Sequence, residues 1–241
     1  MKIIIVQSYS EMSQEAADVV TSTIKANNRA VLGLATGSTP EGMYVELVKR
    51  FRNGLIDFQE VVSFNLDEYL NLPPDHRQSY HYYMKTKLFD HINIRPEKVN
   101  IPSGSAENPE LECSRYDRKI IEAGGINLQI LGIGSNGHIG FNEPADALSI
   151  NTHLVELTPD TLQANSRFFE SLEQVPKKAI TMGMGSIMSA KKILLLASGT
   201  GKARAIKSMS DGIVTTAVPA SLLQLHHDAT VIIDSDAAAL L

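Results

Sequence analysis

The chain has 241 residues, with 22 Lys and Arg against 27 Asp and Glu and a formal net charge of −5. This acidic balance excludes a protein that coats nucleic acid through bulk positive charge. Hydrophobic residues make up 43% of the chain and no low-complexity tract occurs, which excludes a disordered or fibrous protein. The single cysteine, Cys113, excludes an intramolecular disulfide and is typical of a reducing cytoplasm. The apolar run Ile3–Val6 is too short for a signal-peptide core or a membrane span, so we expect a cytoplasmic protein without membrane contact.

Short apolar runs recur along the chain and alternate with segments of helical periodicity. We expect strands at residues 3–6, 31–35, 61–66, 128–133, 153–157, 193–197 and 230–233. Several of these runs are continuously apolar, which is typical of parallel strands covered on both faces.

Apolar residues between these runs fall on one helical face. Clear stripes begin at Met12, Met43 and Tyr80, and a weaker stripe contains Leu111, Ile120 and Ile121. The alternation predicts an α/β fold with a doubly wound, mostly parallel sheet of Rossmann-like type and helices on both faces. Composition does not shift along the chain, so we expect one domain.

Four strand ends carry loops rich in functional side chains. They are residues 36–40 (TGSTP), 67–69 (DEY), 134–138 (GSNGH) and 198–202 (SGTGK). In sheets of this kind, ligands bind at the carboxyl ends of the strands. Two of these loops are Gly-rich turns suited to anions and two carry acid-base groups, which predicts an enzyme acting on a small phosphorylated substrate.

The loop at 36–40 has the pattern of a helix start. Ser38 or Thr39 is a suitable cap after Gly37, and Pro40 suits the first helical position. The amide groups of such a start favour a phosphate, although the same pattern fits a plain capped helix.

The loop at 198–202 ends in a lysine. Lys202 is suited to a phosphate as a point charge, although a lone lysine is more often a solvated surface residue. Leu196 and Ala203 depart from the P-loop pattern, which excludes an NTPase of that type.

Residues 132–137 (GIGSNG) match the glycine pattern of dinucleotide-binding proteins directly after a predicted strand. Gly140 and Pro144 leave no room for the helix that would hold a pyrophosphate, so we do not expect a dinucleotide.

The same segment is better suited to a catalytic loop. Histidine takes and gives protons near physiological pH, and here it is His138. Glu143 and Asn136 are close enough in sequence to orient its ring. A histidine held structurally in a Gly-rich turn is the plainer alternative.

Asp67 follows the apolar run 61–66, so we expect its carboxylate at the rim of an apolar sheet. Partial burial raises the pKa of an acid and makes it a usable base. An aspartate that caps the next turn is the alternative, and spacing does not decide whether Asp67 or Glu68 faces the site. The sequence suggests no metal site, since the neighbouring His226 and His227 point apart.

Three strings together resemble one family, the glucosamine-6-phosphate deaminases. They are LGLATGSTPEG at 32–42, NLDEY at 65–69 and LGIGSNGHIGFNEP at 131–144. The segments 165–169, 175–179 and 198–202 are also similar to that family. The similarity runs in order over essentially the whole chain.

The resemblance implies an enzyme that converts glucosamine 6-phosphate and water to fructose 6-phosphate and ammonia without a metal or organic cofactor. By position, His138 would open the sugar ring with support from Glu143 and Asn136, and Asp67 would move a proton from C2 to C1. The phosphate would be bound by Gly37, Ser38, Thr39, Arg167 and Lys202.

The resemblance also implies one sugar-phosphate isomerase/deaminase domain over residues 1–241, with a mobile lid near 153–182. Part of the family has an aspartate in place of Asn136, so Glu143 alone would supply the negative charge beside the imidazole. His153 and Val155 stand where allosteric hexamers carry basic residues. We therefore expect a monomer rather than a hexamer, and no activation by N-acetylglucosamine 6-phosphate.

Two other activities fit parts of the pattern. A 6-phosphogluconolactonase shares the fold and the G-S-T-P loop, but the NLDEY and NGHIGFNEP strings together favour the deaminase. Sugar-phosphate-sensing domains of bacterial transcription regulators also share the fold. They follow a helix-turn-helix, whereas this chain begins at once with a predicted strand and has no basic segment before it, so we expect no nucleic-acid partner.

Overall fold

The computed structural model describes residues 1–166, 169 and 171–241. Its strands and α-helices are, in chain order, β1 (Lys2–Val6), α1 (Tyr9–Ala26), β2 (Val31–Leu34), α2 (Glu41–Arg52), β3 (Val62–Asn65), β4 (Asp67–Tyr69), α3 (Tyr80–Lys87), β5 (Val99–Asn100), α4 (Pro109–Glu122), β6 (Leu128–Leu131), β7 (His153–Glu156), α5 (Pro159–Ser166), β8 (Lys178–Thr181), α6 (Met184–Met188), β9 (Ile193–Ala197), α7 (Ala203–Ser210) and β10 (Ala229–Asp234).

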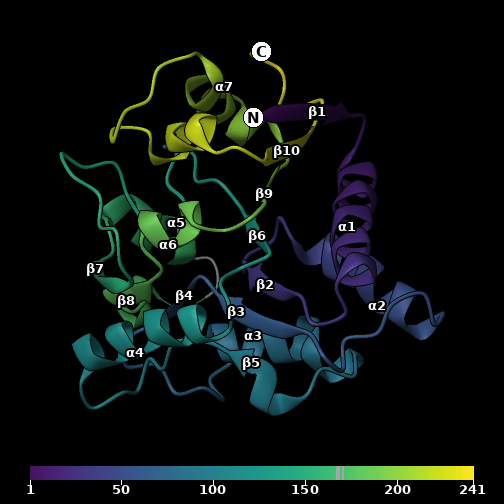
Figure 1. The fold of residues 1–241 in the computed structure, drawn as a ribbon. Helices are drawn as coiled ribbons and strands as arrows, with labels where there is room; N and C mark the ends of the chain where they lie inside the picture. The colour runs from purple at the N-terminus through teal and green to yellow at the C-terminus, as the bar shows by residue number, and fades with distance from the viewer. Residues whose placement is uncertain (167–168, 170) are drawn as a thin grey trace.

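Seven strands form one parallel sheet in the order β1-β10-β9-β6-β2-β3-β5. Helices α1 and α2 lie on one side of this sheet, and α4 and α6 lie on the other (Figure 1). The central strands are apolar on both faces, and every residue of β9 is buried. The predicted α/β class, with a parallel sheet between two layers of helices, is confirmed.

One predicted strand lies outside this sheet. Residues 153–157 were expected in the parallel sheet, but β7 pairs antiparallel with β8, which pairs antiparallel with β4. Most of β7 is only half-buried, so its apolar run does not belong to a strand covered on both faces. The strands β4 and β8 have three and four residues, too few for a run that periodicity would detect.

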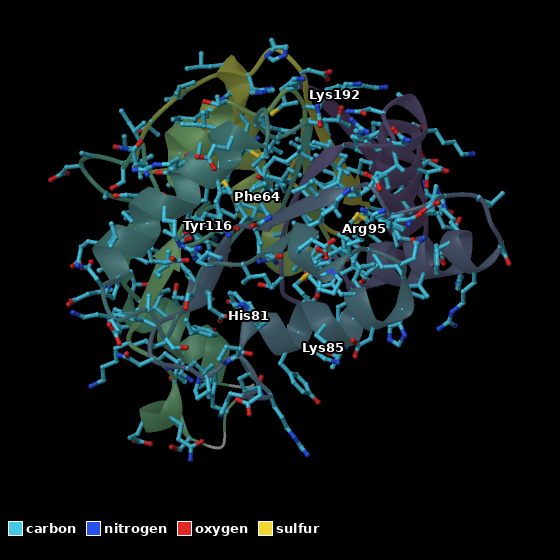
Figure 2. The ribbon with its side chains drawn as sticks, turned by 60° about the horizontal axis from the view of Figure 1, so that its bottom comes forward. Phe64, His81, Lys85, Arg95, Tyr116 and Lys192 are labelled. Carbon is cyan, nitrogen blue, oxygen red and sulfur yellow. The ribbon has the colours of Figure 1, made fainter. Side chains whose placement is uncertain are left out.

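The weak stripe expected on α4 is corrected in part. Ile120 is buried as expected, but Leu111 and Ile121 are exposed, and Cys113 and Tyr116 lie on the buried face in their place. The Tyr116 ring packs edge-on against Phe64 of β3 at a centroid distance of 5.7 Å (Figure 2). Its hydroxyl donates to the carbonyl oxygens of Asn65 and Asn100. An anchoring tyrosine, rather than an aliphatic stripe, therefore sets the orientation of this helix.

Within the residues that the structure describes, no helix is both long and apolar enough to cross a membrane.

Gly33 in β2 is required by a close approach of Gln129 from the neighbouring strand β6. A Cβ on Gly33 would lie 2.0 Å from the Gln129 Oε1 atom, and the Gln129 side chain is fully buried. The two residues face each other in the parallel register. This packing fixes the central strand whose carboxyl end carries the first Gly-rich loop.

We predict that Gly33→Ala lowers the free energy of unfolding by about 1–3 kcal/mol, because the added methyl overpacks the core. Urea unfolding measures the change. In a Gln129→Ala background, Gly33→Ala should cost less stability than it does in the parent, because the clashing amide is absent. An unchanged stability of Gly33→Ala would mean that Gln129 moves aside at no cost.

Candidate active site

The four loops expected at one sheet edge do meet there, because they follow four neighbouring strands: β9, β6, β2 and β3. A cavity of about 530 Å³ opens at this edge. Of the residues predicted for the site, those that line the cavity are Gly37, Ser38, Thr39, Asp67, His138 and Lys202. Asn136 and Glu143 do not line it but contact His138, and Arg167 lies outside the described residues.

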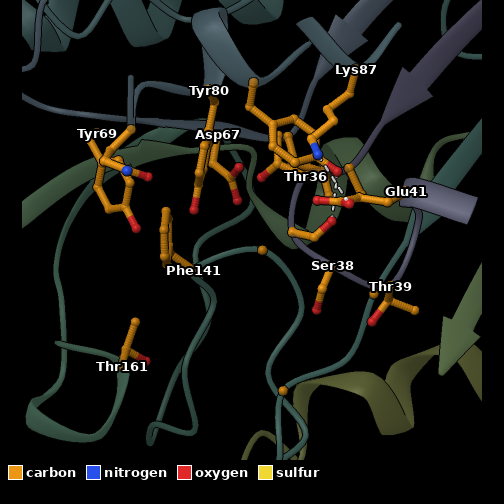
Figure 3. A pocket seen from close by; sticks show the side chains of 18 of the residues that line it. Thr36, Ser38, Thr39, Glu41, Asp67, Tyr69, Tyr80, Lys87, Phe141 and Thr161 are labelled. Atoms are coloured by element: carbon orange, nitrogen blue, oxygen red, sulfur yellow. Dashed lines mark hydrogen bonds and ion pairs between the residues drawn. The ribbon is translucent and has the colours of Figure 1, made fainter. Parts of the chain in front are cut away.

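The loop after β2 turns at Gly37, whose φ of +95° lies in the left-handed region that favours glycine. Helix α2 then begins at Glu41, with Pro40 at the N-cap position and no side chain capping it. The structure thus differs from the expected Ser38 or Thr39 cap. Both hydroxyls remain beside the cavity, close to the helix end that favours an anion (Figure 3).

Two tyrosines hold this loop in place. The Tyr9 hydroxyl of α1 donates to the Ser38 carbonyl at 3.0 Å and accepts from the Gly42 amide at 2.7 Å. The Tyr83 hydroxyl of α3 donates to the Gly37 carbonyl at 2.6 Å. Helices on either side therefore fix the backbone of the anion loop before a ligand binds.

Asp67 begins β4 and its carboxylate is buried against an aromatic wall. The rings of Tyr80 and Phe141 stack beside it at 6.3 Å and 11° (Figure 3). Burial, together with the neighbouring charge of Glu68, raises the pKa of Asp67 to about 8. Within the described residues no side chain or amide hydrogen-bonds to this carboxylate, so it is available to a ligand.

Glu68 has a different role from Asp67. It accepts hydrogen bonds from the amides of Tyr80 and His81 at the start of α3, at 2.9 and 3.0 Å, and contacts His81 Nδ1 at 2.8 Å. Glu68 therefore caps α3 and does not line the cavity. Alternation along β4 turns adjacent carboxylates to opposite faces, which identifies Asp67 as the acid that faces the site.

His138 lies in the loop after β6 and is oriented by Glu143. The Glu143 Oε2 atom lies 3.1 Å from His138 Nδ1 and accepts from Asn136 Nδ2 at 2.7 Å. Asn136 Oδ1 accepts from the backbone amide of His138 at 3.2 Å and makes no bond to the ring. Asn136 thus positions the carboxylate and the loop, and of these two residues it is Glu143 that bonds to the imidazole.

The other oxygen of Glu143 connects the catalytic loop to α5. Glu143 Oε1 accepts from the hydroxyl of Thr161, which also lines the cavity. Partial burial alone would raise the pKa of Glu143, but hydrogen bonds from His138, Thr161 and Asn136 and the charge of His138 outweigh it and lower this pKa to about 2. Glu143 is therefore a fixed negative charge at neutral pH.

Asp234 at the end of β10 holds the Gly-rich loop that carries Lys202. Its carboxylate accepts from the Ser198 hydroxyl and from the Gly199 amide at 3.1 Å. Gly199 has a φ of +88°, and its carbonyl accepts from the Lys202 amide at 3.0 Å. These bonds place Lys202 at the start of α7, on the rim of the cavity.

Sequence reasoning missed several residues of the site. The wall residues Tyr69, Tyr80 and Phe141, and also Thr161, line the cavity. No spacing rule identifies them, because they come from four separate elements, β4, α3, the loop after β6 and α5, which only tertiary packing brings together. Among the described residues, no group of three or more His, Cys, Asp or Glu is placed to hold a metal ion.

The arrangement is suited to proton transfer in a small anionic ligand. Asp67 and His138 line the same cavity in different environments. Asp67 is buried beside aromatic rings, whereas His138 contacts the charged Glu143. The loops at Gly37–Thr39 and Lys202 supply amides and positive charge for an anion at the same edge.

Comparison with known proteins places the chain in a family. Residues 7–232 match the family model described as glucosamine-6-phosphate isomerases/6-phosphogluconolactonase. Curated proteins named glucosamine-6-phosphate deaminase are 59% identical in Thermoanaerobacter sp. (strain X514), covering all of this chain and 95% of the relative, and 58% identical in Halothermothrix orenii, covering both chains completely.

Solved structures agree with the sequence relatives. A monomeric glucosamine-6-phosphate deaminase superposes with a TM-score of 0.98 at 47% identity and covers both chains fully. The 6-phosphogluconolactonase of Trypanosoma cruzi has a TM-score of 0.80 at 22% identity, over all of this chain and 96% of that chain, which shows a shared fold.

The raised pKa of Asp67 predicts a pH-dependent cost to stability. The folded chain keeps a proton on Asp67 from its ordinary pKa of 3.8 up to about 8, whereas the unfolded chain releases it near the lower value. Stability associated with this group is present at low pH and is lost as the pH rises through that range. Asp67→Asn should therefore increase the free energy of unfolding relative to the parent. This increase should be larger at high pH than at low pH, by on the order of 1–2 kcal/mol.

Urea unfolding of both proteins at about pH 5 and about pH 8.5 measures this difference. Asp236→Asn, a change at an exposed residue, is the control. A difference between parent and Asp67→Asn that does not grow with pH would contradict the burial of the ionised carboxylate.

Proposed function

The chain belongs to the family of glucosamine-6-phosphate isomerases and 6-phosphogluconolactonases, and we propose that it is a glucosamine-6-phosphate deaminase acting in amino-sugar catabolism. It converts glucosamine 6-phosphate and water to fructose 6-phosphate and ammonia. The observation that carries the proposal is the pairing of Asp67 and His138 in one cavity with an anion loop. Full-length relatives of 58 and 59% identity with that name support it.

The first chemical step is opening of the pyranose ring by His138. The imidazole moves a proton from the anomeric hydroxyl to the ring oxygen, which breaks the C1–O5 bond and leaves an aldehyde at C1. Glu143, ionised because of its low pKa, holds Nδ1 and stabilises the imidazolium that forms in between.

The second step is isomerisation by Asp67. The carboxylate removes the C2 proton, the electron pair forms the C1–C2 double bond, and the C1 oxygen takes a proton from the substrate ammonium to give an enolamine. Asp67 then returns its proton at C1, which leaves a protonated imine at C2. A substrate ammonium near Asp67 favours the ionised carboxylate, which its burial otherwise opposes. Water then adds to the imine carbon and ammonia leaves. These steps need only acid-base groups, so we propose that the enzyme uses no metal or organic cofactor.

We propose that the substrate phosphate binds the amides of Gly37, Ser38 and Thr39 together with Arg167 and Lys202. The left-handed turn at Gly37 and the uncapped start of α2 support the loop's part in this site.

We also propose that residues 1–241 form one domain in which the segment near 153–182 acts as a lid. Thr161 and Phe169 from this segment line the cavity, whereas β8 at its end pairs with β4. Since β7 also pairs with β8, motion would be confined to residues 157–177 between these two strands. The monomeric state of the solved relative supports a monomer here, and the single Cys113 supports the cytoplasm.

The experiment that tests this function incubates the chelator-treated protein with glucosamine 6-phosphate and follows ammonia directly and fructose 6-phosphate through a coupled assay. We expect the two products in equimolar amounts. No product together with rapid hydrolysis of 6-phosphogluconolactone would show that the phosphate site was interpreted correctly and the chemistry wrongly.

The contacts of Glu143 predict a step-specific defect. Glu143→Gln removes the charge beside His138, so turnover should fall by about 10²–10³-fold on the cyclic substrate and much less on an open-chain analogue. Steady-state rates on both substrates measure the ratio. Equal losses on the two would remove Glu143 from ring opening. Glu173→Gln, an exposed residue on the same proposed lid segment, serves as the control.

A further inference from the structure

We propose that Lys87 is a specificity-determining residue for the substrate phosphate, held beside the anion loop by Glu41. The identity of the ligand rests on the proposed function. The charge argument rests only on the geometry of α2 and α3.

The position of Lys87 on α3 brings it to the cavity that the anion loop lines. Tyr83 and Lys87 are four residues apart, so they lie on the same face of the helix. Tyr83 donates to the Gly37 carbonyl, and Lys87 Nζ lies 3.2 Å from Glu41 Oε2 in the first turn of α2 (Figure 3). Both side chains line the cavity that the loop lines. From one face of α3, Tyr83 thus provides a hydrogen bond to the loop backbone and Lys87 provides a positive charge in the same cavity.

Glu41 makes this positive charge necessary. Its carboxylate stands at the helix end that favours anions, where it would repel a phosphate monoester carrying a charge of about −1.5 to −2. Lys87 offsets that repulsion. An ammonium has three donors, so Lys87 is able to bond Glu41 and a phosphate oxygen together.

The exposure of the pair suits an exchange of partners. The Lys87 and Glu41 side chains are 45% and 38% exposed, so solvent screens their ion pair and makes it weak. A doubly charged phosphate beside uncapped amides is a stronger partner than a solvated carboxylate. Glu41 therefore keeps the ammonium at the loop without competing strongly for it.

The same helix offers a matched control. Lys85 pairs with Asp90 at 2.5 Å, is 64% exposed, and does not line the cavity (Figure 2). Removal of either lysine changes the net charge of the protein equally. Any difference between the two variants reports position rather than overall charge.

The test is a double-mutant cycle with Lys87→Met, Glu41→Gln and the double variant, measured as the KM for glucosamine 6-phosphate and the dissociation constant of inorganic phosphate by calorimetry. We expect Lys87→Met to raise both constants about tenfold and kcat to change about twofold at most, because the bond is made equally before and during reaction. Lys87→Arg should restore both constants to within about threefold. Lys85→Met should leave them within about twofold.

The double variant distinguishes direct binding from screening. If Lys87 contacts the phosphate, Glu41→Gln/Lys87→Met still binds phosphate about fivefold more weakly than the parent. A return to the parent value would overturn the proposal by showing that Lys87 only masks Glu41. Unchanged constants in Lys87→Met, or an equal effect of Lys85→Met, would overturn it as well.

Failure of the proposed function is separable from failure of this inference. Calorimetry with inorganic phosphate needs no turnover, so weakened binding in Lys87→Met supports the phosphate role even if the parent releases no ammonia. Melting temperatures of all variants confirm that each is folded. Tight phosphate binding that Lys87→Met does not weaken overturns the inference alone.

Discussion

The site depends on the parallel pairing of four neighbouring strands. Because β9, β6, β2 and β3 are adjacent and run in the same direction, their carboxyl ends meet at one edge although their sequences are separated by some 160 residues. The register at Gly33 and Gln129 fixes the centre of this arrangement. The apolar sheet therefore sets the positions of the four loops, whereas wall residues such as Tyr80 and Thr161 come from helices α3 and α5.

The two carboxylates of the proposed mechanism receive opposite properties from their surroundings. Asp67 sits among aromatic rings with no hydrogen-bond donor from the described residues, which favours its protonated form. Glu143 is surrounded by donors from His138, Asn136 and Thr161, which favours its ionised form. The same functional group is thus suited to exchange protons in one place and to remain a constant charge in the other.

The sequence predicted six of the seven strands of the large sheet, all but the two-residue β5, and its functional edge, because those features depend on local patterns. Continuous apolar runs marked the buried strands, and the residues after them marked the loops. The small antiparallel sheet was not predicted, since β4 and β8 are short and their pairing joins Asp67 to Thr181 across more than a hundred residues. The exclusion of Glu68 likewise required its contacts with α3. Side-chain partners of this kind follow from tertiary packing, which periodicity does not encode.

The position of β10 has a consequence for the order in which the chain folds. This strand inserts between β1 and β9, so β1 acquires its sheet partner only after more than two hundred further residues have been synthesised. Asp234, which fixes the Ser198 and Gly199 backbone, arrives with the same strand. During synthesis, the Lys202 loop therefore gains this support only after β10 has been made. A nascent or truncated chain that lacks β10 would retain the catalytic residues but not a complete anion site.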